Sequence, residues 1–390
     1  MTVNGHDFYL QIDSEQFVNR SNLPRTGSRI SIWLKMITAI VAVSVVGNIA
    51  IPLSRLSLVA AGAISTSSNL LPFVKQVENW VAAGVGVKQL PSALNGQLAN
   101  EESSIFDNNP CREMPGSSSA ATFCTFGDKK AWPYLVLYGD SLAQMWIPAL
   151  DQLGKQFHFR VLAAVRYGCT IASVVVINYT GTVDPGCAPF RHNVLAKISG
   201  FKELPQVVIF SQWEPSPWMQ ATTASGHTLT ASEWARGVRT TLTTIHQPSI
   251  VEVLLLGVPV ARYDPEACLS SHTTDVYVCN TSVIDGFQGS RGPADATTAT
   301  LASAYPVKLN KLMCTSVQCP AVVHSMFTHA NPIHVNLYYS RALASALGEL
   351  LGCVGARVAA KSLVIGSILQ RLGGTNVTTE RLKICASAGG

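Results

Sequence analysis

Short apolar runs alternate with amphipathic stretches from about residue 111 to residue 352. Continuous apolar runs of this kind are typical of strands buried on both faces, as in a parallel sheet covered by helices. The alternation predicts a doubly wound α/β fold with a parallel sheet of about five strands, whose active site lies at the carboxyl ends of the strands. We expect strands over 134–138, 161–165, 206–210, 251–258 and 321–327, and helices over 142–153, 231–245 and 335–351.

Two later segments depart from this alternation. The stretch 262–305 is polar and predicts a loop-like insertion that could cover a cleft. A second apolar stretch, 354–372, contains Arg357 and Lys361, and these charges argue against a membrane span. The tail after Gly373 is expected to be loosely structured, unless a bond between Cys353 and Cys385 ties it down.

One segment ahead of the α/β pattern is apolar enough for lipid. Residues 36–53 carry no charge over 18 positions, which is near the lower limit for a helix that spans a bilayer. A signal-peptide core is the alternative, but the run is longer than such cores and lies about 35 residues into the chain. Basic residues are more frequent before the run than just after it, so we expect a single-pass anchor with a cytoplasmic N-terminus and an exported main domain.

Composition agrees with a large domain that meets lipid at one end. Of the 390 residues, 47% are hydrophobic and only 13% are charged. The net charge of +5 comes from scattered Lys and Arg residues, and no nucleic-acid module is recognisable, so nucleic acid is not an expected partner.

The ten cysteines all lie after residue 110, on the side of the anchor that we expect to be exported. An even number confined to one region indicates disulfides formed in an oxidising compartment, with buried thiols as the alternative. No CxxC spacing occurs, so no zinc site is predicted. Spacing does not fix connectivity, but eight of them form close sequential pairs: Cys111/Cys124, Cys169/Cys187, Cys268/Cys279 and Cys314/Cys319.

Gly139-Asp140-Ser141-Leu142 follows the first predicted strand directly. A serine at such a strand-to-helix turn presents its hydroxyl at the sheet edge, and its backbone N–H can stabilise an oxyanion. The preceding glycine permits a tight turn. The tripeptide by itself is also compatible with Ser141 acting only as a helix cap.

His334 lies between the last predicted strand and the last predicted helix, which places it in principle at the same sheet edge. A histidine within reach of a serine can take its proton and return it to the leaving group. A structural or surface histidine is the alternative. His324, His329 and His334 are spaced by five, which suits neither one helix face nor alternate strand positions, so no metal is expected.

Four blocks of the sequence resemble those of SGNH domains fused to type-three membrane acyltransferases. The likeness covers roughly 85–350 in order. Leu135–Leu150 resembles the Gly-Asp-Ser-His-Ala-x-x-Trp-x-Pro-Ala-Leu block, and Tyr167-Gly168-Cys169 is similar to the Ser-Gly-Cys-Pro block, whose glycine N–H lines the oxyanion hole. Val207–Trp213 resembles a third block, a strand ending at tryptophan, and Cys319–Val335 resembles the closing block that carries Asp-x-x-His.

The resemblance implies a bacterial, extracytoplasmic enzyme that transfers or hydrolyses an O-linked acyl group, acetyl above all, on a cell-envelope carbohydrate. Ser141 would be the nucleophile and His334 its base, with the N–H groups of Ser141 and Gly168 as oxyanion donors. No cofactor is implied. The multi-span half of the fusion is missing from this sequence, so a separate membrane acyltransferase is a candidate partner.

Residue type and position suggest further roles, and composition together with the resemblance divides the chain. The usual Gly-x-Asn-Asp oxyanion block of the family is absent here. Gln212 is a candidate further oxyanion donor, and Trp213 and Arg166 are candidate substrate contacts. The expected parts are a cytoplasmic tail, a transmembrane anchor, an Ala/Gly/Ser-rich tether, the SGNH-like domain and a C-terminal tail, over residues 1–32, 33–54, 55–105, 106–352 and 353–390.

The sequence departs from the family pattern at the third catalytic position. Asn331 stands where the family has aspartate, and 296–348 contain no Asp or Glu. Three interpretations stay open. A Ser–His dyad could work with Asn331 or a backbone carbonyl holding the ring; a distant carboxylate such as Glu214 or Asp184 could take the third role; or the domain could be a degenerate copy that binds glycan without turnover.

Overall fold

The residues that the computed structural model describes are 71–98, 112–113, 121–177, 181–213, 220–222, 226, 228–361, 367–374 and 378–389, and they form a single compact unit. The expected cytoplasmic tail and transmembrane anchor, 1–54, therefore lie outside the described residues. Among those that are described, no helix has both the length and the apolar character needed to cross a membrane.

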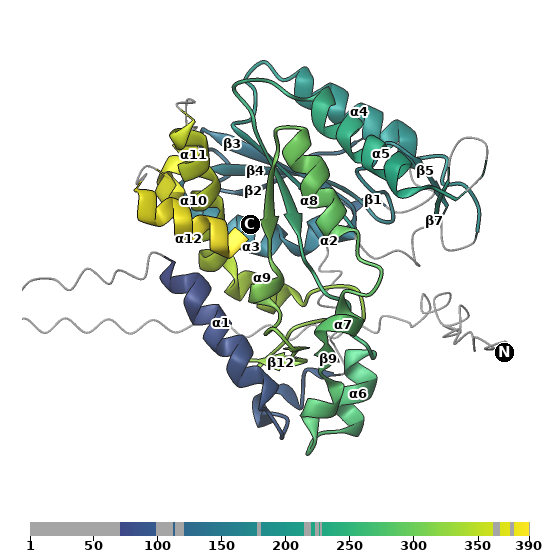
Figure 1. The fold of residues 1–390 in the computed structure, drawn as a ribbon, viewed down its shortest axis with the longest axis vertical. Coiled ribbons are helices and arrows are strands. Elements are labelled where there is room, and N and C mark those ends of the chain that lie inside the picture. The colour runs from purple at the N-terminus through teal and green to yellow at the C-terminus, as the bar shows by residue number, and fades with distance from the viewer. Residues whose placement is uncertain are drawn as a thin grey trace, which may run out of the picture. The chain divides into compact units, whose positions relative to one another are not determined.

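The centre of the fold is a parallel sheet (Figure 1). Its spatial order is β1-β4-β3-β6-β8-β10, and β2 pairs with β4 in the antiparallel sense. The five longer parallel strands thus follow the chain order 2-1-3-4-5, the flavodoxin-like arrangement, which confirms the predicted doubly wound α/β fold. The strand bounds are Arg112–Glu113, Cys124–Gly127, Tyr134–Gly139, Arg160–Arg166, Val207–Ser211, Val251–Leu256 and Tyr305–Lys308 for β1, β2, β3, β4, β6, β8 and β10.

Side chains alternate between two cores, one on each face of the sheet. On β3, Leu135 and Leu137 belong to one core, whereas Val136 and Tyr138 belong to the other. Each fully buried side chain of this size stabilises the fold by ~1.5–3 kcal/mol. The first core is covered by α1 (Pro72–Val85), α3 (Ile147–Phe157), α9 (Leu337–Ala342) and α10 (Ala344–Ala360), and the second by α4 (Cys187–Ser199), α5 (Ala231–Thr244) and α8 (Gly292–Leu301).

The predicted strand over 321–327 is wrong. This run forms a small hairpin of β12 (Val322–Val323) and β13 (Met326–Phe327), which pairs only with itself. The two residues between the strands, His324 and Ser325, both have positive φ, which is the requirement of a tight two-residue hairpin turn. The fifth parallel strand is instead β10, which begins at the last residue of the polar stretch 262–305.

The stretch 262–305 is largely ordered into helices rather than loop. It contains α6 (Pro265–Ser271), a 3-10 turn (Val276–Cys279), α7 (Val283–Gly286), α8 and the start of β10. Its polar residues include helix caps: the side chains of Asp264 and Ser282 accept hydrogen bonds from the backbone N–H groups of Ala267 and Asp285. In Figure 1, α6, α7, β9 (Thr281–Ser282), β12 and part of α1 lie together below the sheet, and β9 pairs with β11 (Gln318–Cys319).

The C-terminal region is packed onto the domain. Helix α10 crosses the expected boundary at 352 and ends at Ala360, and a disulfide joins Cys353 to Cys385 on α12 (Thr379–Gly389). Ile368 and Leu369 of α11 (Ser367–Leu369) are fully buried in the first core. The bond between Cys353 and Cys385, which was the condition for an ordered tail, is therefore present. Remaining elements are a 3-10 turn at Ser92–Leu94, α2 (Ser141–Met145), β5 (Val175–Ile177), β7 (Gln220–Thr222), a 3-10 turn at Asn310–Leu312 and a π turn at Gln370–Gly374.

Disulfides confirm the predicted sequential pairing wherever both cysteines are described. Three of the expected pairs are bonded, Cys169–Cys187, Cys268–Cys279 and Cys314–Cys319. Cys111 lies outside the described residues, so its predicted pairing with Cys124 stays a prediction.

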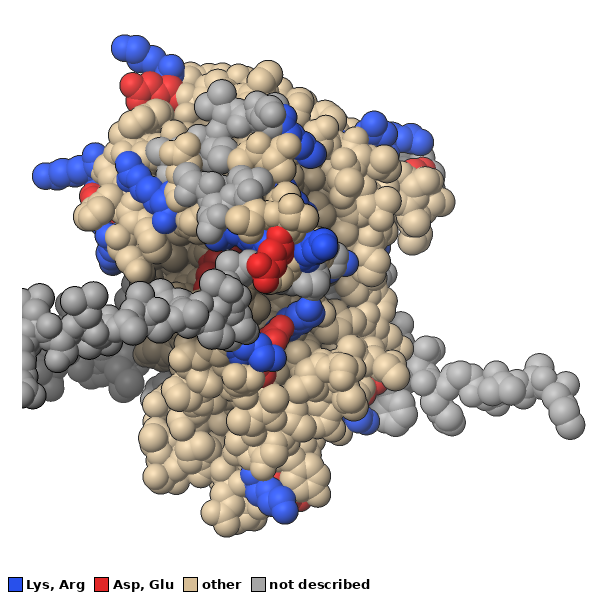
Figure 2. Space-filling model, turned by 60° about the vertical axis from the view of Figure 1, so that its left-hand side comes forward, with Lys and Arg blue, Asp and Glu red and all other residues tan. Residues whose placement is uncertain are grey.

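Surface charge is sparse on the face drawn in Figure 2. The described Lys and Arg side chains stand singly or beside acidic ones, separated by uncharged surface. Most of that face is therefore formed by uncharged side chains, which agrees with the low share of charged residues in the sequence, 13%.

Candidate active site

The turn after β3 carries Ser141 at the first position of α2. Asp140, not Ser141, caps this helix: its Oδ1 accepts a hydrogen bond of 2.9 Å from the N–H of Leu142. Asp140 Oδ2 accepts a second one, of 2.7 Å, from the N–H of Trp213 at the end of β6. The interpretation of Ser141 as a mere cap is thus wrong, and its hydroxyl is not committed to the helix start.

Asp140 is completely buried, and burial raises its pKa to about 7, against the opposing effect of the two backbone N–H donors. Its place is structural. It joins the turn after the first parallel strand to the end of the third, which are neighbours in the sheet. This is the switch point of a 2-1-3-4-5 sheet, where such folds bind their ligands.

Gly139 lets these two strand ends approach. It pairs with Ser211, and a Cβ built at position 139 would lie 1.8 Å from the carbonyl oxygen of Ser211. No side chain fits in that space, so the glycine of the motif is required by the contact between β3 and β6 as well as by the turn.

Gly168 follows β4, the other neighbour of β3, and has a φ of +67°. A hydrogen bond of 3.2 Å from the N–H of Cys169 to the carbonyl of Arg166 closes the turn around it. Within the described part of the chain, the N–H groups of Ser141 and Gly168 have no hydrogen-bond partner. Both therefore remain available at the same edge of the sheet.

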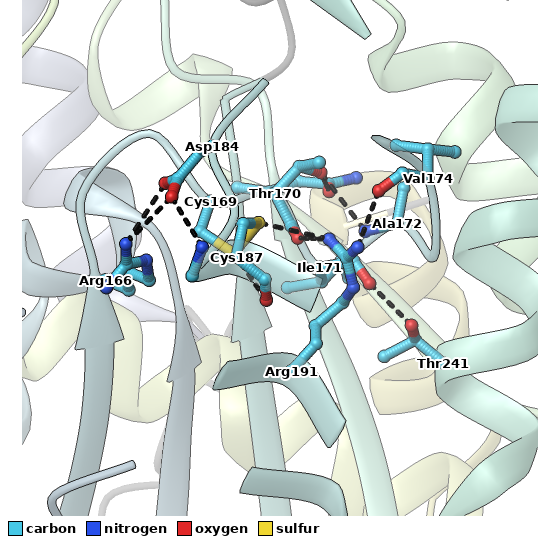
Figure 3. The surroundings of a disulfide bond; sticks show 12 residues. Arg166, Cys169, Thr170, Ile171, Ala172, Val174, Asp184, Cys187, Arg191 and Thr241 are labelled. Atoms are coloured by element: carbon cyan, nitrogen blue, oxygen red, sulfur yellow. Dashed lines mark hydrogen bonds and ion pairs between the residues drawn. A yellow bond between two sulfur atoms is a disulfide. The ribbon is translucent and has the colours of Figure 1, made fainter. Parts of the chain in front are cut away.

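The loop around Gly168 (167–174), which we call the oxyanion loop after the role predicted for Gly168, is held from several sides (Figure 3). The disulfide Cys169–Cys187 links it to the start of α4. The guanidinium of Arg191, on the next turn of α4, donates to the carbonyl oxygens of Thr170 and Val174 at 2.9 and 2.6 Å. These contacts fix the backbone that follows Gly168.

Arg166 differs from its predicted role. It is fully buried, and Nη2 contacts the two carboxylate oxygens of Asp184 at 3.0 and 3.2 Å, as Figure 3 shows. A guanidinium in this position cannot meet a substrate anion. The carboxylate of Asp184 is engaged by this ion pair, and its Oδ1 also accepts a hydrogen bond from the N–H of Gly186. Asp184 therefore does not orient His334 in this structure. Glu214, the other candidate carboxylate, lies outside the described residues.

His334 has a well-defined partner in Asn331. Asn331 Oδ1 lies 3.0 Å from His334 Nδ1 and accepts hydrogen bonds of 2.9 Å from the N–H groups of Ile333 and His334. Two backbone donors on one atom identify that atom as the amide oxygen, because an NH₂ group there would face donors. The proton of neutral His334 must then lie on Nδ1. Its Nε2 is left as the free base, buried and without a partner among the described residues.

His334 lies beside the serine turn and the oxyanion loop. The N–H of the next residue, Val335, donates to the sulfur of Met145 at the end of α2. The imidazole ring stacks on Tyr167, next to Gly168, with 6.4 Å between ring centroids. Burial, helped by nearby His329, lowers the pKa of His334 to about 4, so the ring is neutral at pH 7. The structure shows no hydrogen bond between His334 Nε2 and Ser141.

Gln212 and Trp213 also differ from the expectation. Gln212 is fully buried and engaged at both ends of its amide: Nε2 donates to Asp295 Oδ2 at 2.9 Å, and Oε1 accepts from the hydroxyl of Thr170. Trp213 is 4% exposed, which leaves little of its ring for a sugar. Its indole N–H is buried without a partner among the described residues.

Asp295 is a residue of this region that sequence reasoning missed. It lies on α8, inside the stretch expected to be loop, and is completely buried. Its partners, Gln212 and Trp234, are 83 and 61 positions away in the chain. No local spacing could have signalled this contact.

The fold and this edge define an α/β domain with the Gly-Asp-Ser turn and late histidine of the SGNH class. A model of the family described as "SGNH domain (fused to AT3 domains)" matches residues 110–349, and the chain belongs to that family. A solved structure, described as the periplasmic domain of a lipopolysaccharide acetyltransferase from Salmonella ser. Paratyphi A, is similar over 66% of this chain and 97% of its own, with 11% identity and a TM-score of 0.45. No curated protein matches the chain.

Proposed function

We propose that this protein transfers or hydrolyses an O-linked acyl group, acetyl above all, on a cell-envelope carbohydrate outside the cytoplasm. Membership of the SGNH family supports the reaction class, and the disulfides support an oxidising compartment. The observation that carries the proposal is the Asn331–His334 hydrogen bond, which leaves Nε2 of the imidazole as an unprotonated base.

The reaction would proceed through an acyl-serine. His334 Nε2 takes the proton of the Ser141 hydroxyl as Oγ attacks the acyl carbonyl, and the N–H groups of Ser141 and Gly168 donate to the oxyanion. The C–O bond to the donor alcohol then breaks, and Nε2–H returns the proton to the leaving oxygen. In the second half, Nε2 deprotonates a sugar hydroxyl or a water, whose oxygen attacks the acyl carbonyl. The C–O bond to Ser141 Oγ then breaks, and Nε2–H returns the proton to Oγ. The contact between Oγ and Nε2 would tighten on substrate binding, as is common for catalytic hydrogen bonds.

Asn331 replaces only part of what a carboxylate does. Its amide oxygen fixes the ring and the tautomer, but it carries no charge to stabilise the imidazolium that forms during attack. A slower enzyme than a family member with aspartate is the expected consequence. The membrane anchor over 33–54 would keep such an enzyme close to substrates made at the membrane, and a separate membrane acyltransferase would fit as donor of the acyl group.

The second candidate function is a non-catalytic envelope protein that binds carbohydrate or a partner. The observation that favours it is the replacement of the aspartate by Asn331, with no carboxylate beside His334 among the described residues. The two functions differ in whether Ser141 becomes acylated.

The deciding experiment is acylation of Ser141 in the purified full-length chain. We expect p-nitrophenyl acetate to acetylate the peptide that contains Ser141, detected by mass spectrometry after rapid acid quenching, and this mark to be absent from a folded Ser141→Ala variant. Acyl-enzyme formation requires no acceptor, so a strict transferase would also be detected. A folded wild-type chain that neither forms the adduct nor turns over the reporter would favour the binding function.

Restoring the family residue should accelerate the reaction. In Asn331→Asp the carboxylate would accept the same two backbone N–H groups and stabilise the imidazolium, so we expect kcat for p-nitrophenyl acetate to rise about 10- to 100-fold, or ~1.4–2.8 kcal/mol. The acid limb of kcat/KM should move to higher pH, since a neighbouring carboxylate raises the pKa of His334. Asn331→Leu, which removes the tautomer control, is the matched control and should lose activity. An Asp variant slower than wild type would contradict the assigned role of His334.

A further inference from the structure

A buried chain of hydrogen bonds runs from α8 to the oxyanion loop. Trp234 Nε1 donates to Asp295 Oδ1 at 2.9 Å, and Gln212 Nε2 donates to Asp295 Oδ2 at 2.9 Å. Gln212 Oε1 then accepts from the hydroxyl of Thr170, whose oxygen accepts from the N–H of Ala172 at 3.1 Å. The four side chains, Thr170, Gln212, Trp234 and Asp295, are all buried.

Asp295 decides which group donates and which accepts in each hydrogen bond of this series. An ionised carboxylate only accepts hydrogen bonds, so it forces Gln212 to present its NH₂ group to Asp295 and its carbonyl to Thr170. Thr170 is then obliged to donate. A buried carboxylate is costly, and burial does raise the pKa of Asp295, to about 6. Its two hydrogen bonds and the charge of Arg291, which lies over the ring of Trp234 at 4.1 Å, oppose that cost.

The chain reaches both halves of the candidate site. Thr170 is two residues after Gly168, so its hydroxyl bond adds a restraint on the oxyanion loop to those from the disulfide partner Cys187 and from Arg191. Gln212 is followed by Trp213, whose N–H holds Asp140 in the serine turn. Asp295 is therefore connected to the loop that carries Gly168 through Gln212 and Thr170, and to the serine turn through Gln212 and the N–H of Trp213.

We propose that Asp295 is a positioning residue of the acyl-transfer site, which acts through Gln212 and Thr170 to hold the N–H of Gly168 in place. The inference rests on the function proposed above for Ser141 and Gly168. It assigns Gln212 to the support of the oxyanion loop, in place of direct donation to the oxyanion.

Two substitutions that keep the number of side-chain heavy atoms separate loss of the hydrogen bonds from loss of the charge alone. In Asp295→Asn the amide oxygen can accept from Trp234 while its NH₂ donates to Gln212, provided that the Gln212 amide turns over and donates to the oxygen of Thr170. Every hydrogen bond between the four side chains is then kept, and only the hydroxyl proton of Thr170 loses its acceptor. In Asp295→Leu the donors of Trp234 and Gln212 are left buried without acceptors. Glu252→Leu is the control for loss of a buried acid, because Glu252 is 1% exposed at the start of β8, at the opposite edge of the sheet.

The test measures kcat and KM for p-nitrophenyl acetate and hydrogen exchange of backbone amides 167–172 in the full-length chain and its three variants. We expect Asp295→Leu to lower kcat about 10- to 100-fold with KM changed less than about twofold, because misplacement of a donor affects the transition state most. The loop amides should exchange about tenfold faster. Asp295→Asn should keep kcat within about threefold of wild type, and Glu252→Leu should lose stability while leaving kcat and loop exchange unchanged.

The proposal fails if Asp295→Leu matches Glu252→Leu in kcat and in loop exchange, or if Asp295→Asn is as impaired as Asp295→Leu. The exchange measurement keeps this outcome separate from that of the proposed function. A wild-type chain without turnover would remove the catalytic role, whereas unaltered exchange of 167–172 in Asp295→Leu would remove the positioning role even in an active enzyme.

Discussion

Replacing His334 with Ala is expected to lower kcat/KM for p-nitrophenyl acetate by about 10²- to 10⁴-fold, the usual contribution of a general base. The reason is geometric. Asn331 Oδ1 holds Nδ1–H, so Nε2 is the one nitrogen of this ring that can take the Ser141 proton. His324→Ala is the control: His324 is an exposed histidine of the neighbouring hairpin that stacks on Trp80, and its loss should leave kcat/KM unchanged.

The pH dependence of the wild-type chain provides an independent check on His334. The base acts only when deprotonated, and burial lowers its pKa to about 4, so the deprotonated form persists well below the pH at which ordinary histidines become charged. We expect His334 to give kcat/KM an acid limb near pH 4, since this profile reports the free enzyme. This limb lies below the range in which the buried carboxyls of Asp295 and Asp140, with pKa values of about 6 and 7, become protonated. Equal activity of His334→Ala and wild type, or a limb that persists in the variant, would exclude His334 as the base.

Replacing Gly139 with Ala is expected to destabilise the fold by more than about 4 kcal/mol or to prevent folding, a size of effect that marks a specific structural conflict. The added methyl would lie 1.8 Å from the carbonyl oxygen of Ser211 and 2.9 Å from Cβ of Ala143. The first neighbour is backbone within the central sheet, so relief requires β3 and β6 to separate at the turn that carries Ser141.

Urea unfolding of the full-length chain measures this effect, with yield of soluble protein as the readout if the variant does not fold. Gly96→Ala is the matched control, because a Cβ at position 96 meets nothing within 4 Å. It should change the free energy of unfolding by less than about 0.5 kcal/mol. A Gly139→Ala chain that unfolds at the wild-type urea concentration would show that the sheet at this point can open without cost.

Strands were predictable where burial alone defines them. The runs of β3, β4, β6 and β8 are apolar because both faces of a central strand are covered, and this leaves a clear mark in the sequence. The prediction failed at the sheet edge. β10 has only one neighbouring strand and includes Pro306 and Lys308, so its sequence resembles a loop, while the apolar run 321–327 folds as a hairpin about two positive-φ residues.

The site shows the same division. Ser141, Gly168 and His334 could be picked out because each follows a recognisable element, and parallel strands bring their carboxyl ends to one edge. Arg166 and Gln212 were assigned to the substrate and the oxyanion on sequence position alone. The structure places Asp184 and Asp295 against them, and a buried cation or amide takes the nearest complementary group rather than a ligand.

The sequence by itself predicted the fold class, an oxidising compartment, an apolar segment suited to an anchor, and the residues at the carboxyl edge of the sheet, because periodicity, cysteine content and motif spacing are local properties. Only the tertiary structure decided what holds those residues. Three features depend on the directions of single hydrogen bonds: the tautomer of His334, the ion pair of Arg166 and the series of hydrogen bonds from Asp295 to Thr170. Most of these bonds join residues far apart in the sequence, and the order of residues along the chain does not specify which distant side chains meet or which of them donates.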